Sequence, residues 1–301
     1  MKSDAEEELY TLPKGGHDEY ERLETQHELW LTLVNGLYPQ EIKSEVESKM
    51  RRPADPAILD VGWGRSIQMA HLFPNATVVG LDMTPLGRRD LPSNFSFTPY
   101  NFANGLPSEY RSRFDIIHCR TVTQHVPNPQ GLVNSMAEAL KPGGLLFLAD
   151  IETVVYDKNQ KPLKPVAYNP SWSIEENMNN QDGRSWHSGW FKALGGIILS
   201  PSYQPPSTHV QRSEALTTVI AMELWLPYGL LMEDDGERTK RLGELAVEDF
   251  GQIYCSTRDV FAKTMNQVPK QFMDVLIERG LNEMVTHKHY NRVWYVVGTK
   301  A

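Results

Sequence analysis

The stretch "ILDVGWGRSIQMAHLFPNATVVGLDM", residues 58–83, begins with an apolar run and a glycine-containing turn. A short amphipathic segment and a second apolar run follow, so the order predicts strand, turn, helix and strand. Gly62 and Gly64 would let a ligand approach the backbone, and the helix after them presents free N–H groups. Asp82 ends the second run, where an acid accepts the ribose hydroxyls of an adenosine. The stretch therefore predicts the beginning of a nucleotide-binding half-domain.

Strands and helices are expected to alternate on both sides of this stretch. The expected strands are "AILDVG", "TVVGLDM", "FSFTPYN", "FDIIHCR" and "GLLFLADIE". Continuous apolar runs such as residues 145–149 are typical of parallel strands that are covered on both faces. The alternation predicts a doubly wound, Rossmann-like α/β fold.

The flanking segments divide the chain into four expected parts. Residues 1–52 form an N-terminal helical lid, and residues 53–210 form the α/β core, in which "GGIILSPSY" is one more strand. Residues 211–285 form a helical insertion that covers the substrate, and residues 286–301 form the final strand. The insertion is expected to be helical from about residue 211 to residue 279, including "SEALTTVIAMELWLPYGLLME".

Composition excludes several classes of protein. The 301 residues include 40% hydrophobic residues, enough for a sizeable core, and the formal net charge of -8 argues against a nucleic-acid partner. The two cysteines form no disulfide framework and no zinc pattern, so no metal is expected. No apolar run reaches the length of a membrane span, and no secretory signal is evident. A cytoplasmic protein without a membrane partner is expected, or a nuclear one if its role is regulatory.

The glycine turn distinguishes between two classes of cofactor. A dinucleotide needs a third glycine where Ser66 stands. S-adenosylmethionine has no pyrophosphate and needs one acid near its amino group, a second for the ribose and a polar group for the adenine. Asp60, Asp82 and Asn101 follow the first three expected strands in that order. The pattern favours S-adenosylmethionine, with S-adenosylhomocysteine as the product.

Four stretches carry a resemblance to a known family. They are "ERLETQHELWLTLVNGLYP", "ILDVGWG…FPNATVVGLDMTP", "FDIIHCRTV" and "EALKPGGLLFLADIE". With them the chain resembles class I S-adenosylmethionine-dependent methyltransferases, and more narrowly the fungal secondary-metabolite branch related to velvet-complex regulators. The resemblance implies a seven-stranded, mostly parallel sheet with an antiparallel last strand. It also implies methyl transfer to a small molecule.

The resemblance implies a role for each matching position. Around the methionine portion, ribose and adenine of the cofactor it places Asp60, Gly62, Trp63, Gly64, Asp82, Met83, Asn101 and Phe102. Beside the sulfonium it places Cys119, Arg120 and Thr121, and on the closing N-terminal helix Tyr20, Arg22 and Gln26. Trp63 is expected to form a wall at the methionine end of the site.

The mechanism expected from these residues is an in-line methyl transfer in a dry site. A hydroxyl acceptor needs a base, for which His125 and His27 are the candidates, followed by Glu152. An amine or thiolate acceptor needs no base, so an O, N or S acceptor stays open.

The aromatic-rich second half favours an apolar or aromatic small-molecule substrate. Two other functions stay open: a regulatory protein that keeps the fold and acts through protein partners, and an enzyme that holds the cofactor for different chemistry. A homodimer is also left open.

Overall fold

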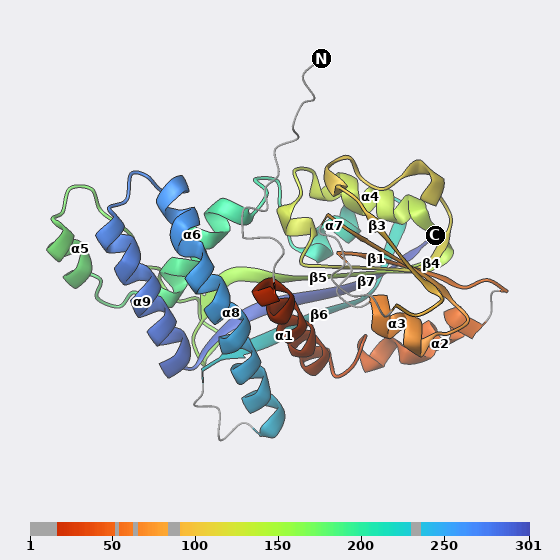
Figure 1. Ribbon diagram of the computed structural model, residues 1–301, viewed down its shortest axis with the longest axis horizontal. Helices are drawn as coiled ribbons and strands as arrows, with labels where there is room; N and C mark the ends of the chain where they lie inside the picture. The colour runs from red at the N-terminus through yellow and green to blue at the C-terminus, as the bar shows by residue number, and fades with distance from the viewer. Residues whose placement is uncertain (1–16, 52–53, 63–65, 84–90, 230–235) are drawn as a thin grey trace, which may run out of the picture.

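A seven-stranded sheet forms the centre of the computed structural model, which describes residues 17–51, 54–62, 66–83, 91–229 and 236–301 (Figure 1). The strands lie in the order β3-β2-β1-β4-β5-β7-β6. They are β1 (Ala57–Val61), β2 (Thr77–Asp82), β3 (Phe95–Pro99), β4 (Phe114–Arg120), β5 (Leu140–Tyr156), β6 (Leu216–Tyr228) and β7 (His289–Lys300). Strands β1 to β5 are parallel, and β7 is antiparallel to both β5 and β6.

Helices precede, connect and follow these strands. The α-helices are α1 (His17–Val34), α2 (Lys43–Arg51), α3 (Ser66–Leu72), α4 (Pro129–Ala139), α5 (Ile174–Asn179), α6 (Trp186–Ile198), α7 (Pro206–Arg212), α8 (Glu237–Thr264) and α9 (Lys270–Thr286). The described residues also form the 3-10 turns η1 (Gln40–Ile42), η2 (Phe102–Asn104), η3 (Ser108–Tyr110) and η4 (Thr123–His125).

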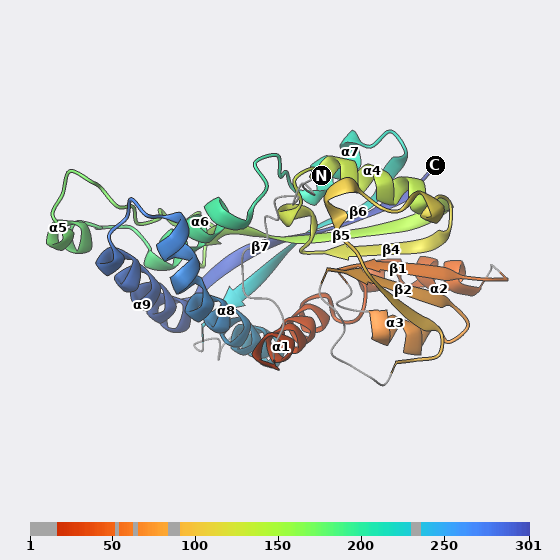
Figure 2. The same ribbon diagram turned by 45° about the horizontal axis from the view of Figure 1, so that its top comes forward.

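Helices cover the sheet from both sides (Figure 2). On one face α4 and α7 pack against apolar side chains such as Leu59, Ile117 and Leu146. On the other face α1, α2 and α3 pack against a core that continues into α6, α8 and α9. The fold is therefore a three-layer α/β sandwich, extended at one end by a helical layer.

The sequence prediction of fold class is confirmed. The five strands expected between residues 57 and 152 are present, and the last strand is antiparallel. The N-terminal helix begins at His17 and ends at Val34, just before Gly36. The short first helix of the half-domain is also present, because α3 has only 7 residues.

The prediction that residues 211–279 are helical throughout is wrong. Residues 216–228 form the edge strand β6, which pairs with β7 along its whole length from Leu216↔Lys300 to Tyr228↔His289. Thr217, Thr218 and Val219 are β-branched and favour an extended chain, and β7 supplies the pairing that decides the outcome. Only α8 and α9 of the expected insertion are helical.

The strand expected in residues 195–203 is also absent from the structure, where α6 continues through Gly195 and Gly196 to Ile198. Helix α6 buries Trp190, Phe191 and Leu194 on one face, so packing outweighs the low helix propensity of the two glycines.

Candidate active site

The carboxyl ends of β1, β2, β3 and β4 bring the positions expected to bind cofactor to one edge of the sheet. Val61 of β1 lies beside Leu81 of β2 and Cys119 of β4. Asp82, the last residue of β2, lies beside Pro99 at the end of β3. The parallel register therefore gathers segments that are separated by tens of residues in the sequence. Trp63 and Gly64 lie outside the described residues.

Gly62 turns the chain at the end of β1 with a φ of 85°. Its N–H donates to the Leu81 carbonyl at 2.8 Å, so the turn is tied to β2. A Cβ at this position would lie 2.5 Å from Val122 Cγ2. Only glycine can adopt this left-handed φ without a Cβ that collides with Val122. This agrees with a turn whose backbone comes close to a ligand.

Thr121 turns the chain at the end of β4 and has a φ of 53°. A β-branched residue rarely adopts this conformation, and strained residues of this kind gather at binding sites. Its N–H donates to the Ala149 carbonyl at 2.8 Å, and its hydroxyl donates to the Arg120 carbonyl at 2.7 Å. The neighbouring strand thus holds the strained turn beside Gly62.

Asp60 is buried and bound to other protein groups. His118 Nδ1 on β4 lies 2.8 Å from Asp60 Oδ1, and the Ser66 hydroxyl donates to Asp60 Oδ2 at 2.8 Å. The residue expected to contact the methionine portion therefore also joins β1, β4 and α3. Ser66, which stands where a dinucleotide site has glycine, gains this bond through its hydroxyl.

The positions expected to lie at the adenosine are more exposed. Asp82 is half-buried, and Met83 is 37% exposed. The exposed Asn101 caps η2, because its side-chain oxygen accepts from the Ala103 N–H at 3.0 Å. Phe102 is buried below it. Asn101, the position expected at the adenine, therefore also closes the turn that follows β3.

Helix α1 lies over this edge of the sheet and is tied to α8. Arg22 NH1 donates to Asp249 Oδ1 at 2.9 Å, and both side chains are buried. Gln26 Nε2 donates to the other Asp249 oxygen at 3.5 Å. Trp30 packs under the Arg120 guanidinium, 5.1 Å from the ring centre. Arg22 and Gln26, expected to bind cofactor, thus anchor the lid in this structure.

Three further expected site residues lie close to these elements. Tyr20 and His27 are half-buried on α1. Cys119 is buried, and burial together with Asp150 raises the pKa of its thiol well above the usual range. Cys119 is therefore a neutral thiol and not a nucleophile.

His125 closes η4 with both ring nitrogens in contact with protein groups. Its Nδ1 donates to the Ile198 carbonyl at 3.1 Å, and its Nε2 lies 3.1 Å from Gln124 Nε2, which donates to it. Burial lowers the pKa of this imidazole to about 4. A neutral imidazole with an accepting Nε2 has the form that a general base needs, but its low pKa makes it a weak one.

We expect His125 to stay neutral at every pH above about 5 in the ligand-free protein, because the group is protonated only as pH falls through its pKa. Imidazole NMR shifts measured from pH 8 to pH 4 test this, with the signal assigned by its loss in His125→Asn. A titration midpoint above pH 6 would contradict the burial seen here.

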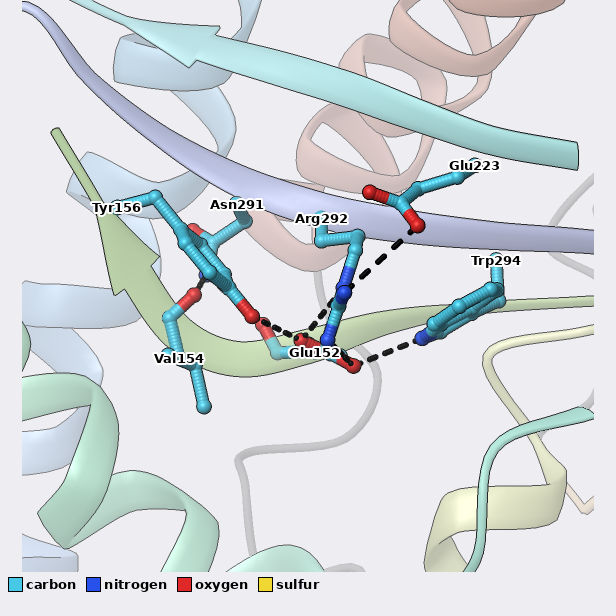
Figure 3. Close-up of polar contacts among 7 residues, drawn as sticks. All are labelled: Glu152, Val154, Tyr156, Glu223, Asn291, Arg292 and Trp294. Atoms are coloured by element: carbon cyan, nitrogen blue, oxygen red, sulfur yellow. Dashed lines mark hydrogen bonds and ion pairs between the residues drawn. The ribbon is translucent and has the colours of Figure 1, made fainter. Parts of the chain in front are cut away.

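Glu152, the third candidate base, accepts bonds from three side chains (Figure 3). Arg292 donates to both of its oxygens at 2.9 and 3.1 Å, Trp294 Nε1 at 2.8 Å and the Tyr156 hydroxyl at 2.8 Å. Burial, with the hydrogen bond to Glu152, raises the pKa of Tyr156 to about 12. Both carboxylate oxygens are thus already hydrogen-bonded to protein donors, which argues against proton abstraction by Glu152.

Sequence reasoning missed two buried acids near the site, Asp150 and Asp249. Asp150 belongs to a strand that was expected, and burial raises its pKa to about 7. Asp249 lies in α8, and nothing in the sequence around it indicates that it pairs with Arg22, 227 residues away. An acid within an apolar strand was a usable signal for the first, and the sequence held none for the second.

Two kinds of feature are absent from the part of the chain that the structure describes. Within those ranges, no group of three or more His, Cys, Asp or Glu side chains is placed to hold a metal ion. None of the helices there combines the length and the apolar character that crossing a membrane requires.

Relatives of this chain include fungal proteins. It is 36% identical over 141 residues to the methyltransferase str3 of Strobilurus tenacellus, covering 44% of this chain and 46% of that protein. It is 28% identical over 157 residues to the secondary metabolism regulator laeA of Coprinopsis cinerea, covering 51% of this chain and 38% of that protein. The chain thus spans less than half the length of these relatives.

Among solved structures, the chain is similar to phosphoethanolamine N-methyltransferase 2 of Haemonchus contortus. The TM-score is 0.45 and the sequence identity 14%, and the match covers 94% of this chain and 58% of that one. The sequence pattern of the methyltransferase domain matches residues 36–195, more than half of the 301 residues and most of the strands that build the site. The predicted resemblance is confirmed, and the chain belongs to the methyltransferase domain family.

Proposed function

We propose that this chain transfers a methyl group from S-adenosylmethionine to an apolar or aromatic small molecule. The observation that carries the proposal is the meeting of Gly62, Asp82 and Thr121 at the ends of neighbouring parallel strands. Ligands of open α/β sheets bind at the carboxyl ends of the strands.

The residues at this edge fit the cofactor. Gly62 leaves room where a Cβ would collide, Asp82 would accept the ribose hydroxyls, and Met83 and Asn101 would lie at the adenine. Thr121 would lie near the sulfur. When bound, S-adenosylmethionine supplies an electrophilic methyl group on a sulfonium.

The chain's own residues supply orientation and exclusion of water. Helix α1 covers the edge and is held by Asp249, while Trp30 and Arg120 join it to the end of β4. A hydroxyl acceptor needs a base, and His125 would serve only by exchanging its Gln124 donor for that hydroxyl, whereas an amine or thiolate needs no base.

The aromatic interior of the helical layer supports the proposed acceptor. Phe191, Tyr228 and Phe250 pack together with ring centres 5.3 to 6.0 Å apart. An acceptor that enters beneath α8 would meet apolar and aromatic surface.

Calorimetry with S-adenosylmethionine and S-adenosylhomocysteine tests the proposal. Both should bind, and Asp82→Ala should weaken binding by about 2–3 kcal/mol, because a charged acceptor for two hydroxyls is lost. Glu109→Ala is the control. Glu109 is an exposed acid in η3, before the start of β4, and β4 begins at the edge of the sheet opposite the proposed site. An unchanged dissociation constant for Asp82→Ala would contradict the assignment of the ribose site.

The same measurements separate the other two functions. Binding of neither ligand supports a regulatory protein that has lost the cofactor. Binding without turnover on a panel of small metabolites supports regulation or different chemistry on the same cofactor.

A further inference from the structure

Asp150 lies on β5 at the point where the strand meets the turn after β4. Ala149 pairs with Arg120, and the Thr121 N–H donates to the Ala149 carbonyl. Asp150 is therefore the next residue along β5 beside the strained turn that is proposed to lie near the sulfur. Its side chain is 1% exposed.

The Asp150 carboxyl group has little to stabilise a negative charge. The Thr123 hydroxyl donates to Oδ2. The other oxygen, Oδ1, has no hydrogen-bond partner among the residues that the structure describes. No Lys, Arg or His in those ranges forms an ion pair with Asp150. Burial is the main reason that its pKa rises to about 7, and the polar groups of Thr123, Tyr203 and Thr121 oppose the rise.

The titratable groups around Asp150 add no positive charge. Cys119 on β4 and Tyr203 after α6 act on it electrostatically, and the pKa of each is raised, so both are neutral. Glu152 on β5 acts on the same Tyr203, and Asp60 on the same Cys119. His125 on η4 is neutral because burial lowers its pKa to about 4. Arg120 on β4 pairs with Ala149, and its guanidinium lies over the Trp30 ring of α1. Among the residues that the structure describes, no cation forms an ion pair with Asp150.

We propose that Asp150 recognises the positive charge of the sulfonium, so that the chain binds S-adenosylmethionine in preference to the neutral thioether S-adenosylhomocysteine. The inference rests on the proposed function. A buried carboxylate is costly without a cation, and a sulfonium beside it offsets that cost. After methyl transfer the positive charge is gone, which favours release of the product.

Proton release follows from the same arrangement. Below about pH 7 the free protein holds Asp150 protonated, so binding the cationic ligand releases one proton. Affinity for S-adenosylmethionine should then rise with pH up to about pH 7, by up to tenfold per pH unit for one released proton. The neutral thioether leaves the carboxyl group protonated and should release none.

The test is calorimetry of both ligands at pH 6, 7 and 8, in buffers of different ionisation enthalpy. Asp150→Asn keeps an oxygen that can accept from Thr123 but has no charge. We expect about one proton released at pH 6 by the wild type with S-adenosylmethionine and none by Asp150→Asn. The preference for S-adenosylmethionine over S-adenosylhomocysteine at pH 8 should fall about tenfold or more in the variant.

A control and a second measurement complete the experiment. Asp115→Asn changes a buried acid at the opposite end of β4, which has Lys141 as its cation at 2.7 Å, and should leave the preference unchanged. The pH dependence of the unfolding free energy tests Asp150 without ligand: the free energy of the wild type minus that of Asp150→Asn should fall from pH 4 to pH 7, because histidines with lowered pKa values such as His125 contribute equally to both proteins. Equal preference and equal proton release in wild type and Asp150→Asn overturn the inference alone. Binding of neither ligand overturns the proposed function as well.

Discussion

Replacing Asp249 by Ala should lower the free energy of unfolding by about 3–5 kcal/mol, because it leaves the Arg22 guanidinium buried without its carboxylate. The two side chains are 7% and 1% exposed, so water does not substitute for the lost partner. Helix α1 should then separate from α8 and expose the carboxyl edge of the sheet. Chemical denaturation measures the loss, and faster proteolysis within α1 measures the separation.

Glu28→Ala provides a matched control on the same two helices. Glu28 pairs with Arg241 at 2.7 Å, but both side chains are about half exposed. An exposed pair of this kind contributes about 0–1 kcal/mol. Equal effects of the two substitutions would show that the buried anchor has no special role in holding the lid.

Replacing Gly62 by Ala should be nearly as damaging, and at the turn where the cofactor is proposed to bind. The new Cβ would lie 2.5 Å from Val122 Cγ2, at a φ of 85° that L-residues rarely adopt. We expect about 2–4 kcal/mol of lost stability from the combined strain and overpacking. Binding of S-adenosylmethionine should weaken by at least tenfold, because the turn must move towards the ligand or away from Leu81.

Gly196→Ala is the control for this substitution. Gly196 lies on the exposed side of α6 with open space around its Cα. Alanine favours the helix there and should raise stability by about 0.5–1 kcal/mol. Thermal unfolding and calorimetry compare the two variants. A Gly62→Ala protein with wild-type stability and affinity would mean that the turn does not approach the cofactor.

Local patterns in the sequence determined the parallel half of the sheet and the strand ends at which the cofactor site is proposed. Apolar runs such as residues 145–149 are typical of central strands buried on both faces, and turn residues mark their ends. Since ligands bind at those ends, Gly62, Asp82 and Asn101 were identifiable without coordinates. This information is local, because each strand's burial and length are encoded in its own residues.

Tertiary structure alone decided which groups meet. Residues 216–228 became a strand because β7, more than sixty residues further along, offers a pairing edge, and β-propensity depends on such context. The same holds for Arg22, whose partner Asp249 is 227 residues away, and for His118, which pairs with Asp60 only through the β1/β4 register. The ionisation of Asp150 also depends on burial by distant segments. A side chain's periodicity tells which face it occupies, but its partners and its pKa depend on what the rest of the chain places against that face.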